Sequence, residues 1–154
     1  MSTTRITRDV KAPRPAVYAA LLDPTAVATW MVPTGMTSQV HMFDARAGGG
    51  FRISLTYDAP TGRGKTTAHT DTYHGRFVEL VTDERVVEVI EFETADPAMR
   101  GEMTITIELS DTEGGTGVLA VHEGVPTGVA TADNEAGWRS SLGKLAALVE
   151  ADNQ

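Results

Sequence analysis

The spacing of apolar residues changes its period along the chain, and this change limits the possible folds more than any other feature. Residues 51–57 and 103–109 alternate apolar and polar side chains, which is the period of a half-buried β-strand. Near the end of the sequence, Trp138, Leu142, Leu145 and Val149 follow the spacing i, i+4, i+7, i+11. This spacing predicts a helix of about 16 residues with one apolar face and with Asp133 as its N-cap.

The first thirty residues predict one strand and two short helices. Residues 6–10 alternate as a strand does. Pro15 suits the first turn of a helix, where its missing N–H has no partner to lose. Asp23 and Pro24 then offer an N-cap and a first helical position for a second short helix that runs to Trp30.

The whole order is strand, two short helices, six further strands and one long helix, which predicts an α+β fold for a single domain spanning residues 1–154. A helix about 10 Å wide cannot cover seven strands spaced about 4.8 Å apart, so the antiparallel sheet must curve around it. Aromatic residues make up only 6% of the chain. With so few bulky side chains to fill the space, we expect a pocket between the sheet and the C-terminal helix.

Charge and composition exclude several classes of function. The chain has 13 Lys and Arg against 21 Asp and Glu, a net charge of −8 with no basic cluster, so nucleic acid and anionic membrane surfaces are poor partners. No run approaches the roughly 20 apolar residues of a membrane span. With no cysteine and no pattern of a targeting segment, we expect a soluble cytoplasmic protein. The triple Gly48–Gly50 lacks the context of a phosphate-binding loop, and we expect no cofactor and no metal.

Several stretches, taken in order, resemble one known family. They are A-P-R-P-A-V-Y at 12–18, Trp30, D-A-R-A-G-G-G-F-R at 44–52, Y-H-G-R-F-V-E-L at 73–80, E-R-V-V at 84–87, and Gly137-Trp138 followed by Leu142 and Leu145. Together they resemble the bacterial single-domain AHSA1-like branch of the START/Bet v 1-like (SRPBCC) superfamily. The resemblance spans nearly the whole chain.

The resemblance implies the helix-grip fold, a curved seven-stranded antiparallel sheet (β-α-α-β6-α) wrapped around a long C-terminal helix. The superfamily includes ligand carriers, hormone receptors and aromatase/cyclases, so the fold alone does not determine the activity. The AHSA1 name comes from the C-terminal domain of a eukaryotic activator of the Hsp90 ATPase. The chain resembles that domain alone and leaves no room for the partner domain of the eukaryotic activators.

Glu88 is the most unusual residue of the predicted strands. It shares its parity with Val86 and Ile90, whose face we expect to be buried. A carboxyl there has a raised pKa or a specific partner, as functional groups often have. The alternative is that Val87 and Val89 face the core and leave Glu88 in solvent.

Three further positions carry possible chemistry. His41 shares its parity with Phe43, and it is either a general base beside the pocket or a surface residue. His69, Asp71 and Tyr73 share one face of a strand and are either an acid–base or metal-ligand group or part of a solvated strand. The same two alternatives apply to His122, which the resemblance implies to lie at a strand end.

We interpret the chain as a binding domain for a hydrophobic or amphipathic small molecule, acting as a monomer or homodimer. We expect the indole N–H of Trp30 to orient that ligand near the mouth of the pocket, with Met31 and Met36 nearby as an adaptable lining. The candidate lining residues are Trp30, Phe51, Ile53, Leu55, Tyr57, Tyr73, Phe77, Glu88, Ile90, Met103, Ile105, Trp138 and Leu142. Two alternatives stay open: a cyclase or hydrolase that uses Glu88 or His41 as acid or base, and a protein-interaction module of the chaperone-activator kind.

Overall fold

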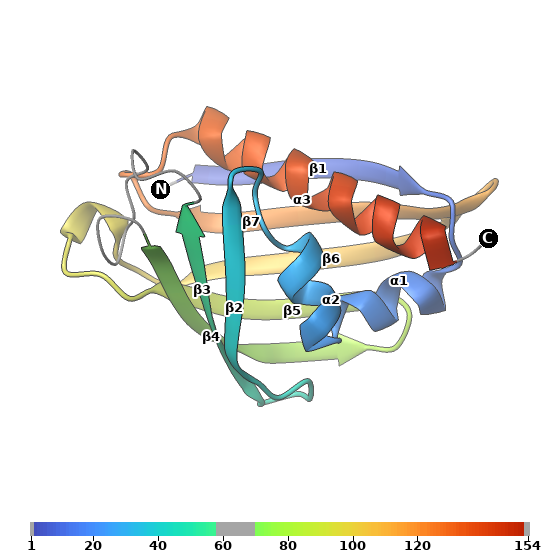
Figure 1. Ribbon diagram of the computed structural model, residues 1–154, viewed down its shortest axis with the longest axis horizontal. Helices are drawn as coiled ribbons and strands as arrows, with labels where there is room; N and C mark the ends of the chain where they lie inside the picture. Colours follow the sequence, from blue (N-terminus) through green and yellow to red (C-terminus); the bar gives the residue numbers. More distant parts are fainter. Residues whose placement is uncertain (1, 58–69, 153–154) are drawn as a thin grey trace.

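A computed structural model describes residues 2–57 and 70–152 of the chain (Figure 1). The elements are β1 (Ser2–Val10), α1 (Arg14–Leu21), α2 (Pro24–Trp30), β2 (Met36–Phe43), β3 (Gly50–Tyr57), β4 (Thr70–Val81), β5 (Arg85–Phe92), the short 3-10 helix η1 (Pro97–Met99), β6 (Met103–Thr112), β7 (Gly115–Val125) and α3 (Thr131–Asp152). The order predicted from the sequence is confirmed, with η1 as the one addition.

Seven antiparallel strands form one curved sheet in the order β1-β7-β6-β5-β4-β3-β2. All three α-helices lie on the same face of this sheet (Figure 1). The long helix α3 runs along β1 and β7, while α1 and α2 cover the part of the sheet between α3 and β2. The predicted helix-grip architecture is therefore confirmed, but the cover of the sheet is shared between α3 and the two short helices.

The predicted starts of the three helices meet different outcomes. Pro15 lies in the first turn of α1, and the side chain of Asp23 caps α2 by accepting from the backbone N–H of Thr25 at 2.9 Å. The predicted N-cap of α3 is wrong. That helix begins at Thr131 and Asp133 lies in its first turn, because backbone hydrogen bonding already starts with the N–H of Asn134 donating to the carbonyl of Ala130.

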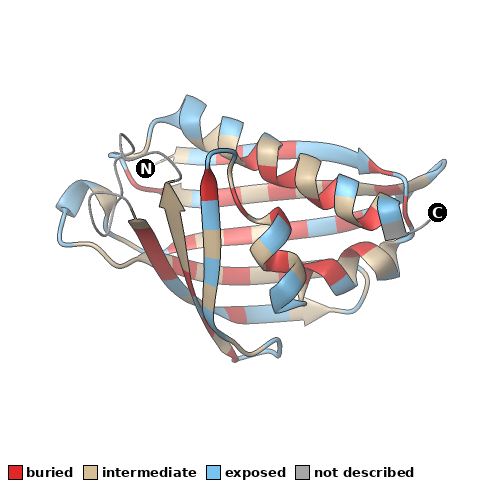
Figure 2. Ribbon diagram, in the orientation of Figure 1, coloured by how far each residue is buried: buried red, intermediate tan, exposed pale blue. Residues whose placement is uncertain are grey.

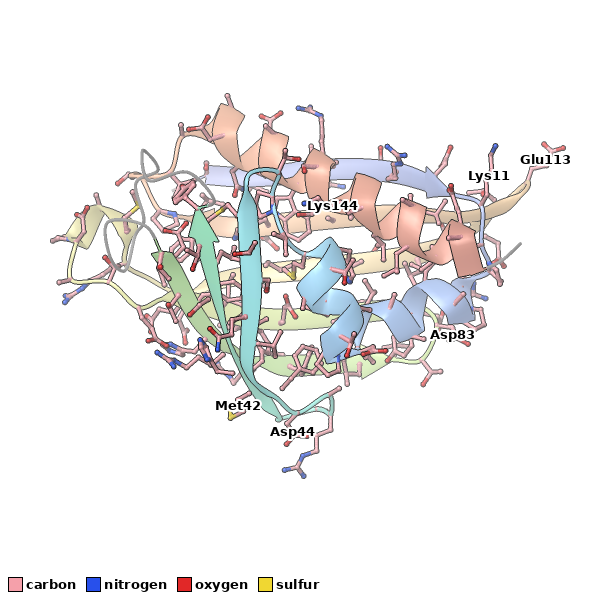
Figure 3. All side chains as sticks on the ribbon, viewed as in Figure 1. Lys11, Met42, Asp44, Asp83, Glu113 and Lys144 are labelled. Carbon is pink, nitrogen blue, oxygen red and sulfur yellow. The ribbon has the colours of Figure 1, made fainter. Side chains whose placement is uncertain are left out.

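Two β-bulges shift the parity of the strands that contain them. The register of β2 with β3 moves from Val40 opposite Ile53 to Met42 opposite Arg52, so His41 is the extra residue. A second bulge inserts Val78 into β4. Because a bulge turns the following residues to the other face, the alternation counted along the sequence fails beyond these points. Met42 is 53% exposed and projects away from the sheet (Figure 3).

The core lies between the sheet and the helices, and the inward positions of the strands and the lower face of α3 are buried in Figure 2. Four of the nine aromatic residues are concentrated in one region of it. The rings of Phe43 and Phe51 pack against Phe77 at centroid distances of 5.5 and 5.1 Å, and Tyr73 packs edge-on against Phe51. The low aromatic content therefore leaves less free space than the sequence suggested. No helix among the described residues is long and apolar enough to cross a membrane.

Candidate ligand-binding site

Glu88 lies on the buried face of β5. Val86, Glu88 and Ile90 are 2%, 8% and 5% exposed, while Val87 and Val89 are only half-buried. The alternative in which the two valines face the core is therefore wrong. Glu88 pairs in register with Phe77 on β4 and Ile105 on β6, both nearly fully buried. A carboxyl group thus occupies an interior position of the sheet, among apolar neighbours.

A small cavity of about 10 Å³ lies beside Glu88. Its lining comes from the centre of the sheet and from the ends of the two short helices. The lining residues are Leu21, Val27, Trp30, Met31, Phe43, Phe51, Ile53, Tyr73, Val86, Glu88 and Ile107. This volume is close to the smallest space that holds one water molecule. The site is therefore closed in this conformation.

The environment of Glu88 is electrostatically uncompensated. No donor among the described residues forms a hydrogen bond with its carboxyl group, and no Lys, Arg or His lines the cavity. Burial raises the pKa of Glu88 to about 7, because the charged form loses its hydration. Burial also raises the pKa of the Tyr73 hydroxyl, and the nearby Glu88 adds to this shift. Both protonation states of Glu88 are therefore accessible near neutral pH.

The indole N–H of Trp30 already forms a hydrogen bond within the fold. Its Nε1–H donates to the backbone carbonyl of Ala20 at 2.9 Å, which ties the end of α2 to the end of α1. The expectation that this N–H orients a ligand is wrong, because the group already has its partner. Trp30 contributes an apolar surface to the cavity and holds the corner between the two short helices.

The structure brings some of the predicted lining residues together and leaves others apart. Trp30, Phe51, Ile53, Tyr73 and Glu88 line the cavity. The remaining predicted residues lie elsewhere: Phe77, Ile90, Met103, Ile105, Trp138 and Leu142 are buried in the core outside the lining, and Leu55 and Tyr57 are half-buried on β3. None of the described lining residues comes from α3. The cavity therefore lies under α1 and α2, and not under the C-terminal helix as predicted.

His41 does not belong to this site. As the extra residue of the bulge in β2, it lies exposed on the outer face of the sheet, where its Nε2 is 2.8 Å from Ser54 Oγ. Phe43, which its parity grouped with His41, faces inward. The alternative of His41 as a general base beside the pocket is therefore wrong, since the sheet separates its side chain from Glu88.

His122 is buried at the other end of the core, between β7 and α3. Its Nδ1 accepts from the indole Nε1–H of Trp138 at 3.0 Å, so the neutral ring carries its proton on Nε2, 3.1 Å from Met103 Sδ. The side-chain amide of Asn134 lies 3.3 Å from the same Nδ1 and donates to Thr4 Oγ1. The solvated alternative for His122 is wrong. Burial lowers its pKa to about 4.

The face of β4 singled out from the sequence is also interior. Asp71 and Tyr73 are 3% and 4% exposed, so the solvated alternative is wrong for them. His69 lies outside the described residues. Within residues 2–57 and 70–152, no group of three or more His, Asp or Glu side chains is arranged to hold a metal ion.

Five lining residues were not predicted as site residues from the sequence, and most of them carried a usable signal. Val86 shares the parity of Glu88, and Ile107 shares the parity of Met103 and Ile105, so both faced the same interior. Leu21 and Val27 belong to the buried faces of α1 and α2. Phe43 had no such signal, because the bulge at His41 reverses its parity. Met31, which was expected as a soft lining residue, follows α2 directly and lines the cavity, whereas Met36 is buried outside the lining.

A wider hollow of about 400 Å³ lies on the surface around Ala12–Pro15, Asp83 and Asp111. The cation there, Arg14, is already paired: its Nε donates to Asp111 at 2.9 Å and its Nη1 donates to the carbonyl of Asp83. This hollow is open to solvent, and its one cation among the described residues already forms an ion pair with Asp111. The closed cavity at Glu88 is the stronger candidate for binding.

Comparison with known proteins gives the chain a family context. A family model described as Activator of Hsp90 ATPase homolog 1-like protein, AHSA1, matches residues 11–150. The structure is similar to that of a protein from Chromobacterium violaceum, with 35% identity and a TM-score of 0.87 over 96% of each chain. No protein with a curated description matched the chain.

More distant structures share the fold alone. An AHSA1-like protein from Aeromonas hydrophila is 19% identical, with a TM-score of 0.72 over 99% of this chain and 94% of that one. A protein from Rhodobacter sphaeroides is also 19% identical, with a TM-score of 0.79 over 97% and 93%.

Proposed function

The chain belongs to the AHSA1 family, and from this premise we propose that it binds a small molecule with an apolar body in the cavity under α1 and α2. The family and its fold agree with a ligand-binding type of domain in general. The observation that carries the proposal is Glu88, a carboxyl that is 8% exposed, has no hydrogen-bond partner among the described residues and faces this cavity.

A buried carboxyl group without a partner lowers the stability of the folded protein. Burying a carboxyl group without a partner destabilises a fold by several kcal/mol, and a well-packed apolar residue of similar size is often more stable there. Phe77 and Ile105, the register neighbours of Glu88, show that this position suits an apolar side chain. A ligand that supplies the missing partner explains why a carboxyl occupies it.

Binding a molecule larger than water requires the cover of the cavity to move, since ligand sites commonly reach about 300 Å³ or more. The cover consists of Leu21 at the end of α1, Val27 on α2, and Met31 just after it. Met31 is unbranched and adapts its shape easily. We place the opening of the site at these residues, with the sheet as the fixed wall.

Native mass spectrometry of the protein purified from its own host tests the proposal. A co-purified small molecule is expected on the wild-type chain and on His41→Ala, whose change lies on the outer face. It should be lost from Glu88→Leu, which replaces the anchor by an apolar residue of similar size. A ligand retained equally by Glu88→Leu contradicts the role of Glu88, and an apo mass for all three chains contradicts the carrier function.

An enzymatic function is the second candidate, and it rests on Glu88 alone. A pKa of about 7 places this carboxyl where a general acid or base works well at neutral pH. His41, the other candidate acid or base, does not line the cavity. If the chain turns over a bound ligand, Glu88→Gln abolishes turnover while retaining part of the binding, which a comparison of product formation and affinity measures.

The interaction-module alternative has no comparable observation. The large apolar side chains exposed in the described part of the chain are Met42 and Val78, each in the bulge region of a different strand. The chaperone link is contained in the family description. We also propose, as the sequence predicts, that the protein is cytoplasmic and that it acts as a monomer or homodimer.

A further inference from the structure

The charges around the cavity indicate which kind of head group the ligand carries. This inference rests on the function proposed above. Of the residues that line the cavity, Glu88 and Tyr73 are the two that can ionise, and both become negative when they do. The others, from α1, α2, β2, β3, β5 and β6, are apolar or, in Trp30, have their N–H occupied. The described lining therefore holds no positively charged group to stabilise an anion.

The C-terminal ends of the two short helices also favour a cation over an anion in the cavity. Leu21 is the last residue of α1 and Trp30 the last residue of α2, and both line the cavity together with Met31, the C-cap of α2. The C-terminal end of a helix carries a partial negative charge and favours cations. Residues from two such ends thus line the same cavity as Glu88.

The charge of the whole chain acts in the same direction at longer range. A net charge of −8 draws cations toward the protein and repels anions. A ligand with a carboxylate head would also place two carboxylates together in a closed apolar space, which strongly disfavours their joint ionisation. Anionic amphiphiles are therefore poor occupants of this site.

We infer that the cavity takes an organic cation, a protonated amine on an apolar body, whose ammonium group hydrogen-bonds to the carboxylate of Glu88 while the body displaces the cover formed by Leu21, Val27 and Met31. The ammonium supplies the donors that the fold leaves out. The apolar body occupies the space between the aromatic cluster and the short helices.

Three probes with the same apolar body and different head groups test this inference: octylammonium, 1-octanol and octanoate, titrated by calorimetry at pH 8. A hydrogen bond to a charged group strengthens binding by about tenfold or more, so octylammonium is expected to bind at least about tenfold more tightly than 1-octanol, with octanoate the weakest. Glu88→Gln should remove the advantage of octylammonium, and His41→Ala should retain it.

The pH dependence of the affinity for octylammonium is a second test of the inference. An alkylammonium stays charged between pH 6 and 8, since its pKa resembles that of lysine at about 10.4. The pKa of Glu88 is about 7, and Tyr73 stays neutral throughout this range. Below pH 7 Glu88 must release a proton to bind the cation, so the affinity for octylammonium should fall by up to about tenfold per pH unit, and that for 1-octanol should not.

The outcomes distinguish a failure of the cation inference from a failure of the proposed function. If 1-octanol or octanoate binds as tightly as octylammonium, the cavity binds ligands but the cation inference is wrong. If octylammonium binds best but keeps its advantage in Glu88→Gln, its site is elsewhere and the inference is also wrong. If none of the three probes binds, neither the inference nor the proposed binding of an apolar body stands.

Discussion

Glu88 and His122 are both ionisable and both buried in the same core, but their surroundings differ. His122, between β7 and α3, accepts a hydrogen bond from Trp138 and lies within reach of Met103 and Asn134. Glu88, under α1 and α2, has no hydrogen-bond partner among the described residues. One end of the core satisfies its polar group internally, and the other leaves it to an external partner. This difference separates a structural polar group from a candidate binding group.

The two groups also oppose each other in their effect on stability. The unfolded chain binds a proton on His122 below its ordinary pKa of 6.5, while the folded chain does so only below about 4, so stability rises with pH in between. For Glu88 the folded chain holds the proton up to about pH 7 and the unfolded chain only up to 4.5, so stability falls with pH in between. The two slopes partly cancel in the wild-type protein.

The largest effect is expected from breaking the satisfied end. His122→Ala leaves the indole N–H of Trp138 without its acceptor and opens a cavity between β7 and α3. We expect a loss of about 4 kcal/mol in the free energy of unfolding at pH 7.5, measured by urea denaturation. The cost should shrink as the pH falls from 6.5 to 4, because the wild-type histidine itself then destabilises the fold. A cost that is constant over this range contradicts the burial of a neutral imidazole.

The next largest effect is expected from a change at Glu88, the buried carboxyl group without a hydrogen-bond partner among the described residues. Glu88→Gln removes the ionisation of Glu88 and with it the stability that the wild type loses as pH rises from 4.5 to 7. We expect the variant to gain about 3 kcal/mol relative to wild type across this window, and little more above pH 7. Urea denaturation at intervals from pH 4.5 to 8 measures the difference. Parallel profiles of the two proteins would mean that Glu88 has an ordinary pKa.

A smaller effect concerns the attachment of the cavity cover to α3. Lys144 on α3 donates from Nζ to the carbonyl of Val32, which follows α2, and Figure 3 shows it between the two helices. Lys144→Met keeps the apolar stem and removes the bond, so we expect a loss of about 1 kcal/mol. Amide hydrogen exchange should become faster after α2, while the amides around His122 keep their rates. Acceleration at both ends would contradict a local attachment.

The smallest effect is expected on the outer face. His41→Ala removes an exposed side chain whose described hydrogen bond is to Ser54, and the change in unfolding free energy should stay within about 0.5 kcal/mol. Urea denaturation of this variant also serves as the matched control for both buried sites. A loss of several kcal/mol would show that the bulge of β2 depends on this imidazole.

Much of the fold is predictable from local patterns. Alternation in 103–109 and the helical spacing of Trp138, Leu142, Leu145 and Val149 identified buried faces that the structure confirms. The candidate site is less predictable. Parity placed Glu88 beside Val86 and Ile90 but left open which face was buried, since Val87 and Val89 are apolar as well. The bulge at His41 has no sequence signature that parity detects, so Phe43 was grouped with the wrong face.

Local patterns along the chain set the order of the elements and the residue types at the interior positions, because hydrophobic period, turns and caps act over a few neighbouring residues. Which end of the core satisfies its polar group is instead fixed by the packing of distant elements. That result depends on how the sheet curves and where the short helices meet it: Trp138 reaches His122 from α3, while α1 and α2 bring apolar side chains, and no donor, over Glu88. Such pairings join residues far apart in the chain, where local spacing carries no information.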